Sequence, residues 1–561
     1  MKYIIVGAVA GGASTAARLR RLNEHAEIII FEKGEYISYA NCGLPYYIGD
    51  VIKDRNKLFV QTASAFNKRF NIDVRISTEV IAINPSAKTI TARKQASGEV
   101  YEESYDKLIL SPGAEPVRPP LPGINNEGIF TLRNVNDTDY IKAYVQQKHI
   151  SKAVVIGAGF IGLEMAENFH KLGLDVTIIE MINQVMAPVD YPVAAFVQQH
   201  IRSKRVKLRL NTAVTGFTKN GDQIEVALNN GEVLVADVVI LSIGVRPDTR
   251  LAVMAGLQLG TAKGIQVNEF LQTSDPDIYA VGDAIEFENP ITHQSMITYL
   301  AGPANKQGRI CADNVVLGNV RSYKGSINTA IVKVFDMTVG TTGTASKHLK
   351  AAGIEHIVST THNGSHAGYY PGAKQMTIQL AFAPKDGKLL SAQIAGYDGV
   401  DKRLDVFASY IKQGKTVYDL IEFEHAYAPP YSSAKDPVNM AGFVAENILL
   451  DRLRVFYWND LDQLQPDDLL IDVRRKDEFE AGNIEGAINI PVDELRNRLH
   501  EIPSNKTLYI YCEAGLRGYL AQRILRQNGY EAVANLSGGY YLWNACTTEM
   551  RLLNKPEPIL V

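Results

Sequence analysis

Cysteine is scarce in this chain. Its 561 residues include four, namely Cys42, Cys311, Cys512 and Cys546. Their wide spacing excludes a disulfide framework, and no second cysteine near Cys42 completes a CxxC or CxxxxC redox pair. Histidine and cysteine also do not occur at the spacings typical of zinc sites. We therefore predict a protein that holds no metal and works in a reducing compartment, the cytoplasm.

Charge of one sign and long apolar runs are also missing. The formal net charge is -3, which argues against a general nucleic-acid partner or an acidic membrane surface. No apolar run approaches the roughly 18 residues that span a bilayer, and Met1-Lys2 leads directly into a short strand rather than a signal peptide. We expect neither a nucleic-acid nor a membrane partner. The length predicts about three or four domains.

The N-terminal segment has the pattern of a dinucleotide site. Residues 2–6 form an apolar run of strand length, followed by a glycine turn with Gly7 and Gly11, a helix, and a second strand that ends in Glu32. In such a unit the glycines let backbone amides approach a pyrophosphate at a helix N-terminus, while the acidic residue accepts from a ribose hydroxyl. The spacing is Gly-x-x-x-Gly-Gly, so this unit alone is a moderate signal.

A second unit of the same kind strengthens the interpretation. Residues 153–156 lead into Gly157-Ala158-Gly159-Phe160-Ile161-Gly162, and a helix and a strand ending in Glu180 follow. Two complete units in one chain predict two nucleotides, FAD and a nicotinamide. Glu180 would repel a 2′-phosphate, which favours NADH, although an arginine elsewhere could reverse that preference toward NADPH.

The segment around Cys42 carries the resemblance to a known family. A thiol without a local partner must cycle against an external thiol or an oxygen atom. The residues Ser38 to Cys42 read Ser-x-x-Asn-Cys, which resembles the active-site motif of the coenzyme A-disulfide reductase and NADH oxidase/peroxidase group of flavoproteins. Residues 105–114, 241–247 and 278–283 resemble the remaining strand-turn segments of such flavoproteins.

The resemblance implies a domain order and a set of cofactor contacts. It implies an FAD-binding domain at 1–115 and 250–320, with an NADH-binding domain at 116–249 inserted between. The cofactor-binding residues that it implies are Gly7, Ala10, Gly11, Glu32, Lys33, Val80, Gly113, Arg133, Asp283, Ala301, Gly157, Gly159, Ile161, Gly162, Glu180 and Gly244.

Two aromatic motifs, at 366–372 and 427–437, look like the interface domain of coenzyme A-disulfide reductases. This implies a dimerisation domain at 321–450 and a homodimer in which Tyr369 and Tyr427 reach the cysteine of the other subunit. A phenol can hold or donate a proton there. The coenzyme A positions implied by the family are Ser14, Arg18, Arg21, Ser38, Asn41 and Lys435.

Two positions depart from the family pattern: Arg18 stands where the family has a glutamine, and Asn305 stands where the family has a histidine. Arg18, Arg20 and Arg21 could hold phosphates, but a charged helix face is more often solvated.

Residues 455–561 closely resemble a rhodanese domain. A strand at 507–511 enters Cys512-Glu513-Ala514-Gly515-Leu516-Arg517, and a helix continues to Gln527. Backbone amides converging on Cys512 at a helix start would hold an anionic persulfide, with Arg517 beside it. Four residues separate Cys512 from Arg517, whereas the phosphatase loop needs five. An inactive rhodanese-like module remains the alternative.

Together these features predict an α/β protein with two Rossmann-like dinucleotide-binding domains, an α+β dimerisation domain and a C-terminal α/β rhodanese domain. The predicted function is an FAD-dependent, NADH-using reductase of coenzyme A persulfide, polysulfide or disulfide, with Cys42 as a mixed disulfide and Cys512 as the sulfane-sulfur carrier. The alternatives are an NADH oxidase or peroxidase that cycles Cys42 through sulfenic acid, and a non-enzymatic flavin redox sensor or sulfur-delivery protein.

Overall fold

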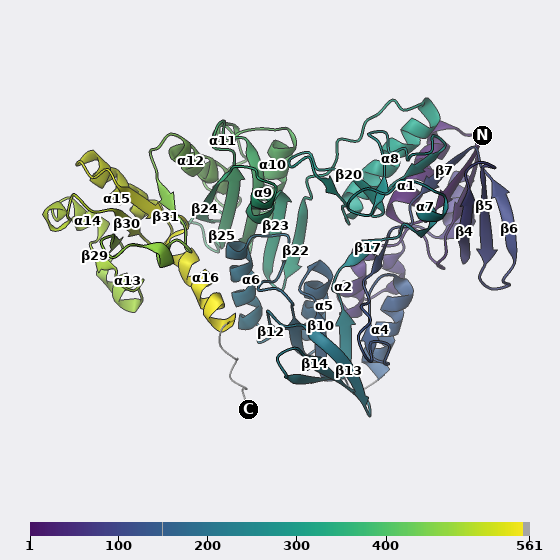
Figure 1. Cartoon of the computed structure of the whole chain (residues 1–561), viewed down its shortest axis with the longest axis horizontal. Coiled ribbons are helices and arrows are strands. Elements are labelled where there is room, and N and C mark those ends of the chain that lie inside the picture. Colours follow the sequence, from purple (N-terminus) through teal and green to yellow (C-terminus); the bar gives the residue numbers. More distant parts are fainter. Residues whose placement is uncertain (148–149, 554–561) are drawn as a thin grey trace. The chain divides into compact units, whose positions relative to one another are not determined.

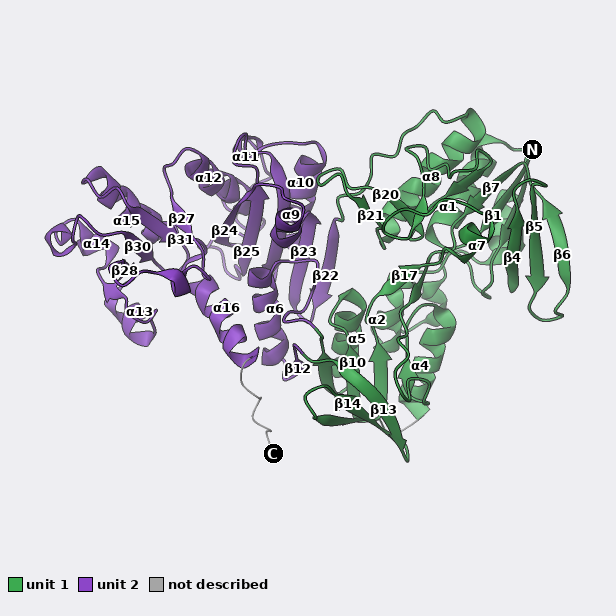
Figure 2. Cartoon of the chain, viewed as in Figure 1, with its two compact units in different colours: residues 1–181, 212–328 green, residues 182–211, 329–561 purple. Residues whose placement is uncertain are grey.

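The computed structural model describes residues 1–147 and 150–553 (Figure 1). The end of the predicted rhodanese domain, 554–561, lies outside the described residues. The chain divides into two compact units, one of residues 1–181 and 212–328 and the other of residues 182–211 and 329 onward (Figure 2). The four domain ranges given above stay a prediction.

A parallel sheet forms the N-terminal part of the first unit. Its strands are, in spatial order, β19 (Ile278–Ala280), β7 (Lys107–Leu110), β1 (Lys2–Val6), β2 (Glu27–Phe31) and β3 (Asp73–Arg75). Tyr3, Ile4 and Ile5 are all fully buried, because a parallel strand covered on both faces needs apolar side chains in succession. Helix α1 (Ala10–Leu22) connects β1 to β2 and packs against α8 (Ala301–Leu317).

A second parallel sheet in this unit repeats the arrangement. Its strands β11 (Asp175–Ile179), β10 (Lys152–Ile156), β16 (Val238–Leu241) and β9 (Ile129–Phe130) are neighbours in that order. Helix α5 (Phe160–Lys171) connects β10 to β11, and α2 (Leu44–Ile48) packs against both α5 and α4 (Val135–Gln147). The two predicted strand-turn-helix-strand units are therefore present.

Smaller elements complete the first unit. The antiparallel sheets are β4 (Thr78–Asn84), β5 (Thr89–Lys94) and β6 (Val100–Ser104); β13 (Val214–Asn220), β14 (Gln223–Leu228) and β15 (Val233–Ala236); and the pair β8 (Ala114–Pro116) and β17 (Val245–Pro247). A mixed sheet contains β18 (Ile265–Gln266), β20 (Ile285–Glu288) and β21 (Ser295–Met296). Helices α3 (Ala63–Phe70) and α7 (Arg250–Met254) lie in the connections.

The second unit begins with an antiparallel sheet. Its strands are, in spatial order, β22 (Ala330–Val334), β23 (Met337–Gly343), β26 (Leu389–Gly396), β25 (Gln375–Phe382) and β24 (Ile357–Gly364). Helix α10 (Val400–Lys412) packs on β23 and β26, and α12 (Pro437–Leu449) packs on β24. The other helices in this region are α6 (Tyr191–Ser203), α9 (Ser346–Ala351) and α11 (Val417–Ile421).

A parallel sheet carries the C-terminal part of the second unit. Its strands are, in spatial order, β27 (Val455–Phe456), β31 (Val533–Leu536), β30 (Leu508–Tyr511), β28 (Leu469–Asp472) and β29 (Ile488–Asn489). Its helices are α13 (Lys476–Ala481), α14 (Val492–Leu495), α15 (Leu516–Gln527) and α16 (Gly539–Leu553). Helix α15 ends at Gln527, as predicted.

The two sheets of the second unit are joined through residues 537–541, a turn followed by the start of α16 and called here the 537–541 segment. The Ser537 hydroxyl accepts from the backbone NH of Thr360 on β24, and the His362 ring contacts the carbonyl of Gly538 at 3.0 Å. The Tyr541 ring packs against His362 and Phe196. Burial lowers the pKa of His362 to about 4, so the imidazole is neutral at physiological pH.

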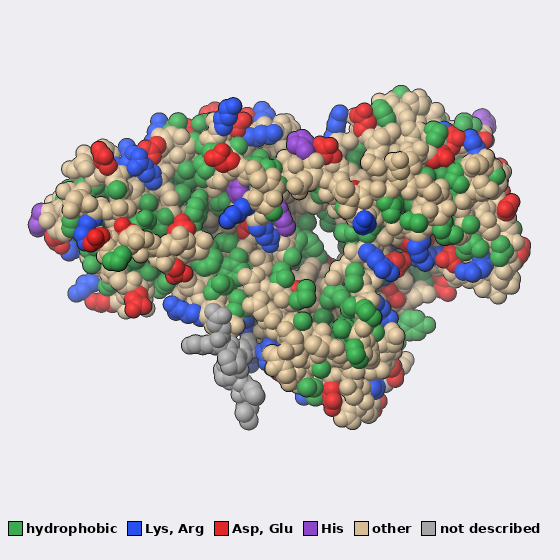
Figure 3. All heavy atoms as spheres, in the orientation of Figure 1, with side chains coloured by type: hydrophobic (Ala, Val, Ile, Leu, Met, Phe, Trp, Pro, Cys, Tyr) green, Lys and Arg blue, Asp and Glu red, His purple; other side chains and the backbone are tan. Residues whose placement is uncertain are grey.

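On the face in Figure 3, lysine and arginine side chains are interspersed with aspartate and glutamate. Among the described residues, no helix combines the length and apolar character that a membrane crossing requires.

Candidate functional site

The first glycine turn is closed so tightly that side chains would not fit. Gly7 has φ +96°, and a Cβ atom there would lie 2.1 Å from the carbonyl oxygen of Ser111. A Cβ on Gly12 would lie 1.9 Å from the carbonyl oxygen of Gly7. Glu32 accepts from the backbone NH of Ala8 at 2.9 Å, which fixes the carboxylate beside the turn. The start of α1 can therefore approach a pyrophosphate closely.

The second turn has the same geometry. Gly157 has φ +97°, and its Cβ would lie 2.4 Å from the carbonyl oxygen of Ser242. A Cβ on Gly162 would lie 1.9 Å from the carbonyl oxygen of Gly157. Glu180 accepts from the NH of Ala158 at 2.8 Å, as Glu32 does in the first turn. Gly159 precedes α5, Ile161 is exposed, and Gly244, with φ +107°, lies in the turn after β16.

A cavity of about 470 Å³ opens at the first turn. Nine of the ten residues predicted to contact FAD line it, and the exception is Ala301, whose helix α8 contributes Ala304 instead. The nine are Gly7, Ala10, Gly11, Glu32, Lys33, Val80, Gly113, Arg133 and Asp283. The cavity, the tight turn and the acidic strand end fit a dinucleotide whose diphosphate lies at α1.

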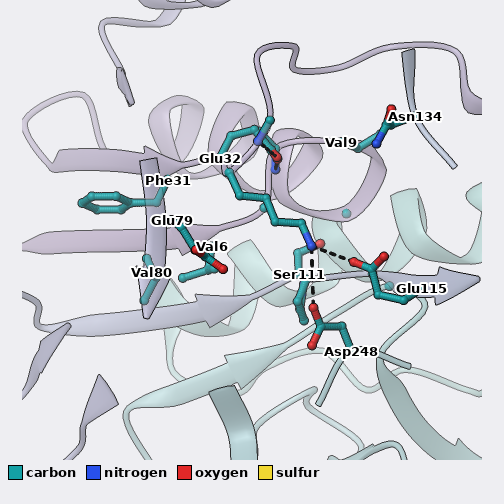
Figure 4. Close-up of a pocket in the computed structure, with 18 of the residues that line it drawn as sticks. Val6, Val9, Phe31, Glu32, Glu79, Val80, Ser111, Glu115, Asn134 and Asp248 are labelled. Carbon is teal, nitrogen blue, oxygen red and sulfur yellow. Dashed lines mark hydrogen bonds and ion pairs between the residues drawn. The ribbon is translucent and has the colours of Figure 1, made fainter. Parts of the chain in front are cut away.

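Part of the lining was missed by sequence reasoning. Lys33 forms ion pairs with Glu115 at 2.6 Å and with Asp248 at 3.8 Å. Figure 4 shows Glu115 and Asp248 beside the cavity. Arg250 in turn pairs with Asp248 at 2.7 Å. Glu115 comes from β8, Asp248 from the segment after β17 and Arg250 from the start of α7, where no motif marks them. Contacts with Arg250 and Lys33 hold the pKa of Asp248 below its usual value, against the effect of burial.

Arg133 connects the cavity to the cysteine segment. Its Nε donates to the carbonyl of Ala114, and its guanidinium lies against Gly113, whose φ of +75° favours glycine. The Asn41 side chain, with its amide oriented to match, accepts from this guanidinium at 3.0 Å and also lines the cavity. The residue next to Cys42 is therefore part of the cavity wall.

Cys42 itself lies in a short 3-10 turn, Asn41–Gly43, immediately before α2. It is the exposed one of four free cysteines, while Cys311, Cys512 and Cys546 are buried. Ser38, with φ +45°, donates its NH to the carbonyl of Ala8, which ties this segment to the first glycine turn. The pKa of the Cys42 thiol is raised, first by desolvation and then by the charges of Glu164 and Asp283.

Glu164, on α5, is a neighbour of Cys42 that no sequence pattern marked. Tyr46, on α2, donates to its carboxylate at 3.2 Å. Burial raises the pKa of Glu164 to about 7, with a further contribution from Glu167 and an opposing one from Tyr46. The carboxyl group therefore changes charge within the physiological range and lies close enough to act on the thiol.

We expect Glu164→Gln to make Cys42 more reactive, but only at alkaline pH. Above pH 7 the wild-type carboxylate is ionised and disfavours the thiolate, whereas below pH 7 it is largely neutral and resembles glutamine. Iodoacetamide should alkylate Cys42 of the reduced variant roughly two- to fivefold faster at pH 8. Peptide mass spectrometry measures this rate residue by residue. Equal rates at pH 6 serve as the control, and an equal gain at both pH values would contradict the prediction.

The three arginines of α1, Arg18, Arg20 and Arg21, differ in their contacts and exposure. Arg20 is buried, and its guanidinium donates to the carbonyls of Asn23, Glu24, Phe70 and Asn71, so the interpretation that it holds a phosphate is wrong. Arg18 pairs with Asp313 at 2.8 Å, and the Ser14 hydroxyl bonds to Asn305 at 2.5 Å. Arg21 is exposed.

The two predicted tyrosines lie together in the second unit. The Tyr369 and Tyr427 hydroxyls are 2.7 Å apart, and both side chains are exposed, at 76% and 46%. This hydrogen bond raises the pKa of Tyr427. The segment that carries Tyr427 and the exposed Lys435 is anchored by a buried pair, Arg403 with Asp436 at 2.8 Å.

Cys512 follows β30 and is almost fully buried. Its sulfur accepts from the backbone NH of Gly515 at 3.1 Å, and Gly515 has φ +116°, which lets the loop close over the sulfur. Its backbone carbonyl accepts from the backbone NH of Tyr540 in the 537–541 segment. Arg517, predicted beside this loop, forms a bidentate pair with Glu478 at 2.6 and 2.7 Å.

Comparisons with known proteins match three parts of the chain to families. Residues 1–308 match the family described as pyridine nucleotide-disulphide oxidoreductase, residues 329–437 match its dimerisation domain, and residues 457–546 match the rhodanese-like domain. The predicted fold class, with its dinucleotide-binding, dimerisation and rhodanese domains, is thereby confirmed.

Curated relatives and solved structures agree with this assignment. The coenzyme A disulfide reductase of Staphylococcus aureus is 36% identical over 445 residues, 79% of this chain and all of the relative. A structure described as reduced Bacillus anthracis CoADR-RHD is 50% identical with a TM-score of 0.96 and covers 98% of both chains. A NAD-dependent persulfide reductase from A. fulgidus is 36% identical with a TM-score of 0.90, over 97% of this chain and 100% of the other.

Proposed function

Because the chain belongs to the pyridine nucleotide-disulphide oxidoreductase family and also carries a rhodanese-like domain, we propose a two-site sulfur enzyme. It is an FAD-dependent, NADH-using reductase of coenzyme A persulfide, polysulfide or disulfide, with Cys42 as the reducible sulfur and Cys512 as the sulfane-sulfur carrier. The observation that carries this function is one exposed, solitary thiol whose neighbour Asn41 lines the dinucleotide cavity.

The first glycine turn and its cavity are proposed to hold FAD, and the second turn is proposed to hold NADH. When bound, FAD supplies the two-electron chemistry that carries reducing equivalents from NADH to sulfur. Glu32 and Glu180 are each fixed beside a turn by a backbone NH, where a carboxylate accepts from a ribose hydroxyl. A carboxylate at Glu180 disfavours a 2′-phosphate, which supports NADH over NADPH.

Cys42 is proposed to rest as a mixed disulfide with coenzyme A. Two-electron reduction of that bond frees the Cys42 thiolate and the coenzyme A thiol. The thiolate then attacks the carbon-bound sulfur of the next coenzyme A persulfide, the S–S bond breaks, and hydrosulfide leaves as the mixed disulfide forms again. With a disulfide substrate, the leaving group is a coenzyme A thiolate.

Coenzyme A is proposed to contact Ser14, Arg18, Arg21, Ser38, Asn41 and Lys435. The arginine at position 18 is committed to Asp313, so a phosphate there would share the guanidinium with that carboxylate. Arg21 and Lys435 are exposed and carry charges that suit phosphate groups.

A homodimer is the proposed assembly, in keeping with the dimerisation-domain match. Tyr369 and Tyr427 would then serve the cysteine site of a second copy of the chain, where paired phenols hold a proton for a departing thiolate. All four cysteines are free thiols, which supports a reducing compartment such as the cytoplasm.

NADH consumption tests the proposed function, measured without oxygen for the sulfur substrates and for peroxide, and separately with oxygen as the acceptor. We expect turnover with coenzyme A persulfide or disulfide to exceed turnover with oxygen or peroxide by roughly tenfold or more, since Cys42 is matched to a thiol partner. Mass spectrometry of the unreduced protein should also show a coenzyme A adduct on Cys42. Faster turnover on oxygen would instead favour an oxidase, and flavin reduction well below about one per second would favour a redox sensor.

A further inference from the structure

The charges around Cys512 are paired in a way that bears on its sulfur donor. Arg517 is held by both oxygens of Glu478. Arg474 is held by Asp472 at 2.8 Å and by Glu513 at 3.1 Å. Two arginines thus face three carboxylates, so the group is net negative by one charge. Adding the neighbouring pair of Arg475 with Asp477 leaves that balance unchanged.

Neither arginine is available to a donor as an unpaired cation. The Arg474 side chain is 3% exposed, donates to the carbonyl of Gly482, and lies over the Tyr540 ring at 4.0 Å. Arg517 is the arginine that interacts electrostatically with Cys512. Its pKa is raised first by Glu478 and to a smaller extent by the charges of Cys512 and Glu513. The positive charge of Arg517 beside Cys512 is therefore already balanced by the Glu478 carboxylate.

The rim of the loop is acidic and apolar. Cys512 is 1% exposed, so a donor must present one sulfur atom inward while the rest of the molecule stays at the rim. The Glu513 side chain is 42% exposed and Leu516 is 66% exposed. A sulfonate group at this rim would meet a carboxylate and a leucine. An uncharged carbon chain would not be repelled by the Glu513 carboxylate, and it has no charge whose hydration is lost against Leu516.

We infer that Cys512 takes its sulfane sulfur from an organic persulfide whose chain is uncharged near the sulfur, and that Glu478 and Glu513 exclude the thiosulfate dianion. This inference rests on the proposed sulfur transfer at Cys512 and names the class of donor. The Cys512 thiolate attacks the outer sulfur of R–S–SH, the S–S bond breaks, and R–S⁻ leaves while the proton stays on the new persulfide. With thiosulfate the same attack releases sulfite, whose two charges the site does not offset.

The test measures sulfur loading of Cys512 in the full-length protein. Rapid quenching followed by peptide mass spectrometry records the gain of one sulfur atom on Cys512, with pantetheine persulfide or thiosulfate as the donor. NADH is omitted, so the Cys42 reaction does not contribute. In the wild type we expect the second-order rate constant for the persulfide to exceed that for thiosulfate by about 100-fold or more.

Glu478→Gln keeps the shape of the side chain and removes its charge. We expect thiosulfate loading to rise about tenfold and persulfide loading to change less than about twofold. Glu513→Gln should act in the same direction. Glu480→Gln is the matched control, because Glu480 lies on the same helix, α13, and is exposed beside Lys476. It should leave both donors unchanged.

Ionic strength separates an electrostatic effect from a change of shape. Thiosulfate loading of the wild type should accelerate as sodium chloride is raised from low to physiological concentration, because screening weakens the repulsion. The dependence should flatten in Glu478→Gln. Comparable wild-type constants for the two donors, equal effects of Glu478→Gln and Glu480→Gln, or no loading from either donor would each overturn the inference. A failure of the proposed reductase would appear separately, as absent NADH turnover with intact loading.

Discussion

Replacing Cys42 with serine abolishes NADH-dependent reduction of coenzyme A persulfide and disulfide, with an expected loss in kcat of about 1,000-fold or more. The reason is that a hydroxyl forms no mixed disulfide, so electrons have no sulfur to reach. The exchange is sterically mild, because Cys42 is exposed in a short turn and its sulfur fills no core position. FAD content and stability should stay close to those of the wild type.

Two measurements on the same preparation separate loss of the sulfur step from general damage to the protein. Stopped-flow absorbance should show that NADH still reduces the flavin of Cys42→Ser at about the wild-type rate, while steady-state NADH consumption with coenzyme A persulfide is lost. Retained turnover would refute the role of Cys42. A loss of flavin reduction as well would show that the variant is damaged elsewhere.

The complementary variant, Cys512→Ser, should lose sulfur loading and sulfur transfer entirely, because a serine hydroxyl stays protonated at neutral pH and neither attacks sulfane sulfur nor carries it. Serine retains an acceptor for the NH of Gly515, so the loop should keep its conformation. Reduction of coenzyme A persulfide by NADH should stay within about twofold of the wild type.

Each variant is the control for the other, since each removes one sulfur atom and spares the second site. The measurements are peptide mass spectrometry for sulfur on Cys512 and NADH absorbance for the reductase. If Cys512→Ser eliminates both activities, the two sites do not work independently and the scheme is wrong.

The backbone-driven parts of the fold were predictable from sequence, and the reason is steric. At Gly7 and Gly157 a Cβ would collide with a carbonyl oxygen just past the end of the neighbouring strand, so the glycine spacing directly encodes the turn. The acidic strand ends Glu32 and Glu180 carry the same information. Strand and helix limits followed from short apolar runs bounded by these turns, as at β1 and α15.

Side-chain pairings between distant segments were not predictable in this way. Tyr46 and Glu164 meet because α2 packs on α5, and Glu478 reaches Arg517 from a different strand connection. Neither pair has a motif, since any carboxylate brought close by the fold would serve. Arg20 shows the converse failure: an arginine on a charged helix face looked solvated or phosphate-binding, yet the carbonyls around Phe70 enclose it.

The 537–541 segment makes the C-terminal module difficult to remove from the rest of the second unit. The carbonyl of Gly538 contacts the imidazole of His362 on one side, while the backbone NH groups of Tyr540 and Tyr541 donate to the cysteine loop on the other. Removing the module would expose that imidazole and the Phe196 ring to solvent, because Tyr541 packs against both. A rhodanese domain grafted from another protein would therefore need side chains that pack against His362 and Phe196 in the same way.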